Sequence, residues 1–219
     1  MKYLILALSV FIFLNTNAQT RVLKKVKTTK RELNSADINR LNLETKIVGK
    51  TALPALYRFK DKKLILNGAG LRELLWVDVY ACGLYLNAPD TSPEDIIDGN
   101  EIMIVRMDIL SKAVSHKKLV SAFKKGFEDA NSPGIVKKLN PEITEFLSKI
   151  SNLQLKVKDK VDVVYEPEIG VSLYLNYDKI GTVGGIDFKK AIFRIWLSDH
   201  PVDKSLRTEL LNGAKEFIK

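Results

Sequence analysis

The hydrophobic residues along the chain predict a folded domain that begins near residue 53. Six runs rich in Val, Ile, Leu and Tyr are bounded by Gly, Pro, Asn or Asp, which is typical of β-strands. They span residues 62–66, 74–86, 102–107, 161–165, 171–175 and 180–183. The last three follow one another across short turns and predict an antiparallel meander. Residues 67–70, Asn-Gly-Ala-Gly, predict a turn between the first two strands.

Between these strands, apolar residues recur at intervals of three and four positions, which predicts helices. One stripe contains Leu119, Phe123 and Phe127, and Ser115 before it is a suitable N-cap. Three further helices are expected to begin at Asn140, Asp187 and Asp203. Strands in groups, separated by helices in pairs, favour an α+β fold in which a large antiparallel sheet carries helices on one face.

Residues 1–18 have the layout of a secretory signal peptide. Met1 and Lys2 form a short positive segment, residues 3–14 are almost entirely apolar, and Ala18 ends the polar segment that follows. The apolar run has 12 residues, whereas a membrane-spanning helix needs about 20. We therefore expect cleavage near Ala18 and export to the periplasm or the medium.

The formal net charge of +9 is concentrated in one segment. Between residues 21 and 63 lie 13 of the 35 Lys and Arg residues but only 4 of the 26 Asp and Glu residues. Such a segment can bind anionic lipid head groups or nucleic acid. Aromatic platforms for base stacking are nearly absent from its first half, so we do not expect a nucleic-acid-binding protein. We interpret residues 19–52 as a basic arm or linker, with peripheral membrane contact as one role, and residues 53–219 as the domain.

The composition excludes several kinds of chemistry. The single cysteine, Cys82, rules out a disulfide scaffold or a multi-cysteine metal site, and it lies in an apolar stretch that predicts a buried, inert thiol. His116 and His200 are the only histidines, which leaves little for zinc or histidine chemistry. Gly68 and Gly70 lack the third glycine of a dinucleotide-binding loop. We expect no metal and no cofactor.

Arg72 carries the strongest chemical signal in the sequence. It follows the glycine-rich segment 67–70 and precedes a long apolar strand. In dry surroundings a guanidinium can hold a carboxylate or a phenolate through two hydrogen bonds. The alternative is structural: a salt bridge to a neighbour such as Asp108, or a side chain that faces solvent.

Three blocks of the sequence occur in a characteristic order. They read NGAGLR at 67–72, VYACGLYL at 79–86 and IDFKKAIFRIWLSDHPVDKSL at 186–206. Together they resemble the chalcone isomerase-like superfamily, most closely its exported bacterial members of unassigned function, over about residues 53–213. The resemblance implies a large, mostly antiparallel sheet with a layer of helices and an apolar cleft between the two. The superfamily includes plant enzymes that close a chalcone into a flavanone, and proteins that bind fatty acids in the same cleft.

The resemblance also places the family's polar groups on this chain. Arg72 matches the arginine that holds the reacting oxygen, and Tyr80 stands where the enzymes have a threonine. Val114 falls on a tyrosine position and can donate no hydrogen bond. The asparagine of the central helix falls near Ser121, and Ile195 replaces a second threonine. Most donors that would polarise the substrate ketone are therefore absent or displaced.

These substitutions favour binding over catalysis, because removing one such donor costs about 3 kcal/mol of transition-state stabilisation. The preferred hypothesis is a carrier or sensor that holds a fatty acid or similar amphipathic carboxylate. One alternative is an isomerase of the intramolecular lyase type with Arg72 and Tyr80 as catalytic candidates, and another is a structural or partner-binding domain. The candidate ligand-binding residues are Arg72, Tyr80, Arg106, Ser121, Ile195 and Trp196.

Overall fold

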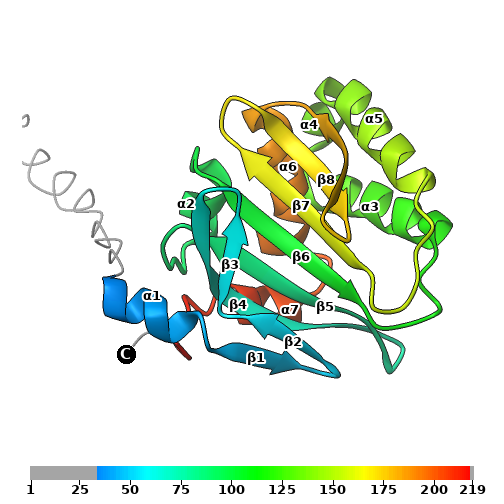
Figure 1. Ribbon diagram of the computed structural model, residues 1–219. Helices are drawn as coiled ribbons and strands as arrows, with labels where there is room; N and C mark the ends of the chain where they lie inside the picture. The colour runs from blue at the N-terminus through cyan, green and yellow to red at the C-terminus, as the bar shows by residue number, and fades with distance from the viewer. Residues whose placement is uncertain (1–33, 218–219) are drawn as a thin grey trace, which may run out of the picture. The chain divides into compact units, whose positions relative to one another are not determined.

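Residues 34–217 are described by the computed structural model, and their main element is a seven-stranded antiparallel sheet (Figure 1). The strands pair in sequence order from β3 to β9. They are β3 (Leu56–Phe59), β4 (Lys62–Leu74), β5 (Val77–Leu86), β6 (Met103–Ile109), β7 (Lys160–Glu166), β8 (Gly170–Leu175) and β9 (Asp178–Val183). A separate two-stranded sheet is formed by β1 (Thr45–Val48) and β2 (Thr51–Pro54). The predicted α+β class and antiparallel sheet are confirmed.

Helices α3 to α6 lie behind the sheet in the view of Figure 1. The helices of the described residues are α1 (Ser35–Leu41), α2 (Pro93–Asp98), α3 (His116–Ala130), α4 (Pro133–Lys138), α5 (Asn140–Ser151), α6 (Ile186–Leu197) and α7 (Lys204–Leu210). None of them is both long enough and apolar enough to cross a bilayer. Four of these helices have only six or seven residues, too few to show a clear periodic stripe. Of the four, α7 was predicted from its cap residue Asp203, whereas α1, α2 and α4 were not predicted.

Two of the predicted helix caps are confirmed and two are wrong. The side chains of Ser115 and Asp203 accept backbone N–H groups at the starts of α3 and α7. Helix α6 instead has Gly185 at its N-cap, without a side-chain hydrogen bond, and Asp187 lies inside the first turn. Helix α5 has Leu139 at the N-cap position in place of Asn140.

The central strands of the sheet are covered on both faces, which explains why β6 and β7 are continuous apolar runs rather than alternating ones. In β6, Val105 belongs to the core between the sheet and helices α2 to α7. Its neighbour Ile104 belongs to a second core on the opposite face, together with Leu41 of α1 and Leu53 of β2. Successive strand residues point to opposite faces, so β5, β6 and β7 contribute side chains to both cores. We call these the helix face and the second face.

The predicted turn at residues 67–70 is wrong, because β4 continues through it to Leu74. The glycines serve a different purpose: they let α7 lie directly on the strand. A Cβ built on Gly68 would overlap the carbonyl oxygen of Glu209 and lie 2.7 Å from that of Leu210. Asn67 secures the contact, since its side-chain amide donates to the Leu210 carbonyl at 2.8 Å. The hairpin turn falls at residues 75–76, between β4 and β5.

The predicted domain boundary at residue 53 falls inside the β1–β2 hairpin and is too late in the chain. Residues 34–52, expected to be a loosely attached arm, contain α1 and β1, and Leu41 is fully buried. This segment carries no periodic signal in the sequence, because its buried residues are few and widely spaced. The predicted signal peptide and residues 19–33 lie outside the described residues.

Substitution of Gly68 by alanine tests the contact between α7 and β4. We expect Gly68→Ala to lower the free energy of unfolding by at least about 2 kcal/mol, because the added methyl group meets backbone that cannot turn aside. The matched control is Gly134→Ala in α4, where an added Cβ has no neighbour within 4 Å. That change should leave stability unchanged or raise it by up to about 1 kcal/mol.

Urea unfolding followed by circular dichroism measures both effects. If Gly68→Ala were as stable as Gly134→Ala, α7 would not be held against the strand as described.

Candidate ligand-binding site

The candidate site lies where β4, β5 and the start of α7 meet on the helix face of the sheet. Arg72 of β4 and Tyr80 of β5 are direct partners in the antiparallel register. Gly68 and Gly70 precede Arg72 on the same face, and both lie against residues of α7. The glycine segment thus brings the first residues of α7 beside Arg72.

Asp203, the residue that caps α7, pairs with Arg72. One carboxylate oxygen of Asp203 accepts the Leu206 N–H at 3.0 Å, and the other accepts from Nη1 of Arg72 at 3.1 Å. The two side chains are 20% and 17% exposed, so this ion pair is partly open to solvent. The sequence identified Asp203 as a cap, but it carried no signal for the pairing. The structural partner suggested for Arg72 was Asp108, and in the structure it is Asp203.

The guanidinium of Arg72 keeps donors for a further acceptor. Its hydrogen bonds to residues 34–217 go to Asp203 and to the carbonyl of Glu73, and both leave from Nη1. A guanidinium has five N–H groups, and those on Nε and Nη2 lie on one edge. That edge has the geometry that binds a carboxylate through two parallel hydrogen bonds.

Tyr80, the register partner of Arg72, offers a neutral hydroxyl on the same face of the sheet. Its oxygen accepts a hydrogen bond from Nε1 of Trp196 in α6 at 3.4 Å. Burial, the largest cause, raises the pKa of Tyr80 above its ordinary value, so the hydroxyl keeps its proton at neutral pH. The oxygen therefore accepts from Trp196 and retains an O–H that can donate.

Aromatic side chains fill the layer behind Tyr80. Trp196 packs edge-on against Phe123 of α3, with ring centroids 5.7 Å apart, and Phe123 packs in the same way on Phe146 of α5 at 5.2 Å. Ile195, another predicted site residue, is buried beside Gly126 of α3. The apolar residues predicted for this layer are therefore buried in it.

Arg106 lies on the second face, away from Arg72. It forms two hydrogen bonds to Asp162 of β7, at 2.7 and 2.8 Å, and a third to the hydroxyl of Tyr57. Its guanidinium also lies over the rings of Tyr57 and Tyr177, 4.4 and 5.0 Å from their centroids. With a side-chain exposure of 3%, Arg106 is fully engaged within the fold and does not join the Arg72 group.

The remaining predicted residues take structural positions. Ser121 is exposed on α3, and its hydroxyl donates to the carbonyl of Lys117. Val114 is buried before α3 and supplies no polar group to the site. Cys82 is fully buried, and burial raises the pKa of its thiol, in agreement with the predicted inert cysteine. Within residues 34–217, no three His, Cys, Asp or Glu side chains gather as a metal site would require.

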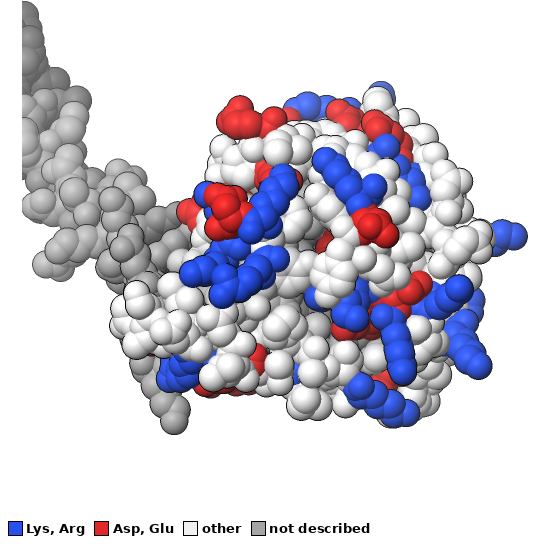
Figure 2. Space-filling view, viewed as in Figure 1, with Lys and Arg blue, Asp and Glu red and all other residues white. Residues whose placement is uncertain are grey.

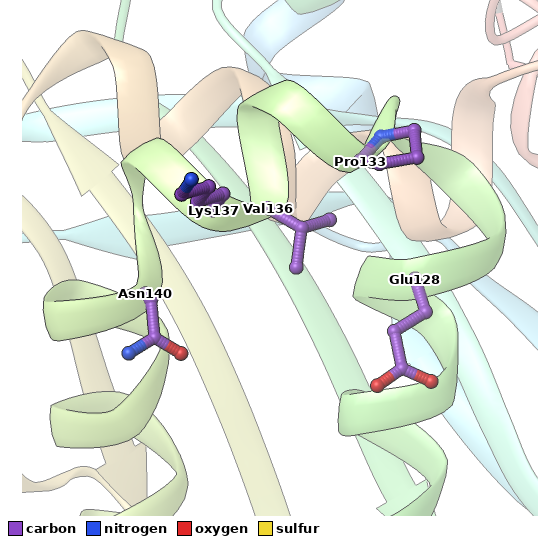
Figure 3. Close-up of a pocket in the computed structure, with 5 residues that line it drawn as sticks. All are labelled: Glu128, Pro133, Val136, Lys137 and Asn140. Carbon is purple, nitrogen blue, oxygen red and sulfur yellow. The ribbon is translucent and has the colours of Figure 1, made fainter.

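A surface pocket of about 420 Å³ lies elsewhere, among α3, α4 and the start of α5 (Figure 3). Its lining contains none of the predicted site residues and consists of Glu128, Pro133, Val136, Lys137 and Asn140. The charged residues of this lining, Glu128 and Lys137, have opposite signs, so the pocket offers no net charge to hold an anionic head group. The Arg72 group remains the better candidate.

Comparison with known proteins supports the resemblance noted in the sequence. Residues 45–212 match the model of a family described as chalcone isomerase-like. The crystal structure of a fatty-acid binding protein from Arabidopsis thaliana has the same fold, with a TM-score of 0.63 and 20% sequence identity over 80% of this chain and 98% of that one. A search among curated proteins finds no match.

The two arginines can be distinguished by removing the charge of each partner. We expect Asp162→Asn to lower the free energy of unfolding by about 3 kcal/mol, because it leaves Arg106 charged and buried. Asp203→Asn should cost less than about 1 kcal/mol, since asparagine also caps helices and the ion pair is partly solvated.

Chemical denaturation of the two variants beside the wild type measures this difference. An equal or larger loss in Asp203→Asn would identify Arg72 as a structural residue like Arg106.

Proposed function

The chain belongs to the chalcone isomerase-like family, and from that premise we propose that it binds a fatty acid or similar amphipathic carboxylate without catalysis. The head group lies at Arg72 and the tail runs into the apolar layer between the sheet and the helices. Carrier and sensor are both consistent with this chemistry.

One observation carries the proposal: Arg72 keeps an edge of two donor nitrogens, and its direct partner in the strand register is Tyr80, whose hydroxyl retains its proton. A carboxylate there accepts from Nε and Nη2 of Arg72 and from the Tyr80 hydroxyl. Its two oxygens thereby receive three hydrogen bonds, two of them from a cation. Asp203 can remain on Nη1 and keep the guanidinium in place.

The tail must share space with the aromatic side chains behind Tyr80. Trp196 is the residue in question, because it touches both the Tyr80 hydroxyl and the ring of Phe123. A carboxylate that accepts a hydrogen bond from the Tyr80 O–H leaves the Tyr80 oxygen able to keep accepting from Trp196. Movement of the Trp196 indole would make room for the tail between the sheet and the helices. Burial of the tail against apolar side chains would offset the free-energy cost of that movement.

Relatives of this fold support a lipid ligand. The Arabidopsis structure that shares the fold is that of a fatty-acid binding protein. An interface lined by Phe123, Ile192 and Trp196 suits an acyl chain, since it contributes no charged group to the tail.

The isomerase alternative finds less support. Val114 and Ile195 are apolar and buried, so they cannot polarise a ketone. The structural alternative rests on the Arg72–Asp203 ion pair, which links β4 to α7. The structural alternative predicts no affinity for acids, whereas the proposal predicts an affinity that depends on Arg72.

We further propose that the protein is exported after cleavage near Ala18, and that the basic segment 19–33, the part of the predicted arm that lies before the described residues, contacts membrane surfaces. The support is the sequence pattern of residues 1–18 and the positive charge of the segment that follows. N-terminal sequencing of the protein recovered from the exported fraction tests the cleavage: a mature chain that begins near Gln19 is expected, and an intact Met1 would contradict it.

Replacement of Arg72 should abolish most of the affinity for acids. We expect Arg72→Ala to weaken binding of palmitate at least about tenfold, because hydrogen bonds to a charged group contribute roughly 1.5–3 kcal/mol. The matched control is Arg58→Ala, an exposed arginine of β3 that bonds to Asn42. Isothermal titration calorimetry with palmitate and with its methyl ester measures the effect, and the ester should bind both forms weakly.

Two results would contradict the proposal. The first is an Arg72→Ala variant that folds normally and binds palmitate within twofold of the wild type. The second is a wild-type protein that binds the methyl ester as tightly as the acid. If Arg72→Ala instead lost stability by several kcal/mol while palmitate did not bind wild-type protein, the structural alternative would be correct.

A further inference from the structure

The turn between β4 and β5 exposes four consecutive apolar side chains. Leu74, Leu75, Trp76 and Val77 have exposed fractions of 56%, 84%, 98% and 45%. A nearly fully exposed tryptophan is unusual, since apolar side chains this large are normally buried. We call these four residues the hairpin tip.

The backbone at the hairpin tip adopts a conformation that is costly for residues with large side chains. Leu75 and Trp76 both have positive φ angles, 49° and 68°. Two-residue turns of this kind favour Asn-Gly, because left-handed backbone is costly for residues with a large side chain. Neither side chain contributes to a core, so the fold itself does not explain why they stand here. Strain of this kind is characteristic of functional segments.

Exposed lysines lie around the tip. Lys50 occupies the β1–β2 turn next to Gly49, whose backbone lies against Leu71 and Asp78 at the base of the hairpin. Lys204 begins α7 next to Asp203, the partner of Arg72.

Two more lysines come from the ends of neighbouring strands. The N–H of Leu110 donates to the carbonyl of Val79 at 3.1 Å, which places the segment leading to Lys112 beside β5. Lys158 donates its own backbone N–H to Ile109 at 2.8 Å. Figure 2 shows Lys and Arg side chains gathered at the lower right, the end of the sheet where Figure 1 draws this hairpin.

The charge around the tip is positive on balance. Its acidic residues are Glu73, Asp78 and Asp159, one fewer than the four lysines, whereas Asp203 is neutralised by Arg72. Within residues 34–217, none of the four lysines forms an ion pair, so their ammonium groups are available to another partner.

We propose that the hairpin tip docks the protein on an anionic lipid bilayer, with Trp76 and Leu75 in the interface and the four lysines on the head groups. Tryptophan prefers the boundary between head groups and acyl chains, and lysines near it are attracted to anionic lipids. A narrow tip of four residues suits insertion better than it suits a protein partner, which requires a broad complementary surface. The proposal does not depend on Arg72 binding an acid.

Fluorescence provides a direct test, because the chain has two tryptophans and the other, Trp196, is buried. With vesicles of phosphatidylcholine and phosphatidylglycerol, the emission of wild-type protein should shift to the blue and be quenched by brominated acyl chains. Vesicles of phosphatidylcholine alone should give a weaker effect, and high salt should reverse the binding to the anionic vesicles.

The decisive variant is Leu75→Asn with Trp76→Gly, which installs the residues preferred by this turn. We expect it to melt at the same or a higher temperature than the wild type, so a loss of function cannot be attributed to unfolding. Its affinity for anionic vesicles in a sedimentation assay should fall at least tenfold. The matched control is Ile169→Ser, a 48% exposed apolar residue in the turn between β7 and β8, which should bind as the wild type does. All forms carry the same N-terminus, so the segment before residue 34 cancels in the comparison.

Two outcomes would overturn the proposal. One is equal sedimentation of the wild type and the turn variant. The other is a wild-type protein that ignores vesicles but dimerises in a manner that the turn variant abolishes, since the tip would then contact a second copy of the chain.

Discussion

The arrangement of the molecule depends on the direct contact between helix α7 and strand β4. Gly68 and Gly70 remove the side chains that would hold the two apart, and Asn67 fixes the helix end through the Leu210 carbonyl. Because α7 lies this close, its cap residue Asp203 reaches Arg72. The glycine segment 67–70 is therefore a surface on which a helix packs. Through Asp203 at the start of that helix, this packing also orients the guanidinium of Arg72.

The sequence predicted the fold class and most of the elements, for identifiable reasons. The meander of β7 to β9 and the stripe of α3 depend on local signals, turn residues and helical spacing, and both were confirmed. The position of the β4–β5 turn was predicted wrongly for two reasons. The glycines of β4 are required by contact with α7, about 140 residues later in the chain, and not by a turn. The turn itself has Leu75 and Trp76 where glycine would be expected. The N-terminal elements were missed because their burial on the second face depends entirely on the tertiary structure.

The candidate site shows the same limit. Arg72 and Tyr80 could be selected from sequence, and the strand register brings them together. Arg106 had an equally apolar setting in sequence, yet it lies on the other face with Asp162 and Tyr57. Strand alternation alone could have separated the two arginines only if the register between β4 and β6 had been known. Asp203 was recognisable as a helix cap, but only the packing of α7 reveals that it also orients Arg72.

The central claim is that the Arg72 guanidinium holds a carboxylate, and the ionisation of a bound acid tests it most directly. The measurement is the ¹³C resonance of carboxyl-labelled palmitate in complex with the protein, followed as the pH is lowered. A carboxylate paired with a guanidinium should stay ionised well below the pH of about 4–5 at which a solvated carboxyl gains its proton. We predict a bound resonance that does not titrate through this range. A bound resonance that titrates as in water, or no bound resonance at all, would contradict the account.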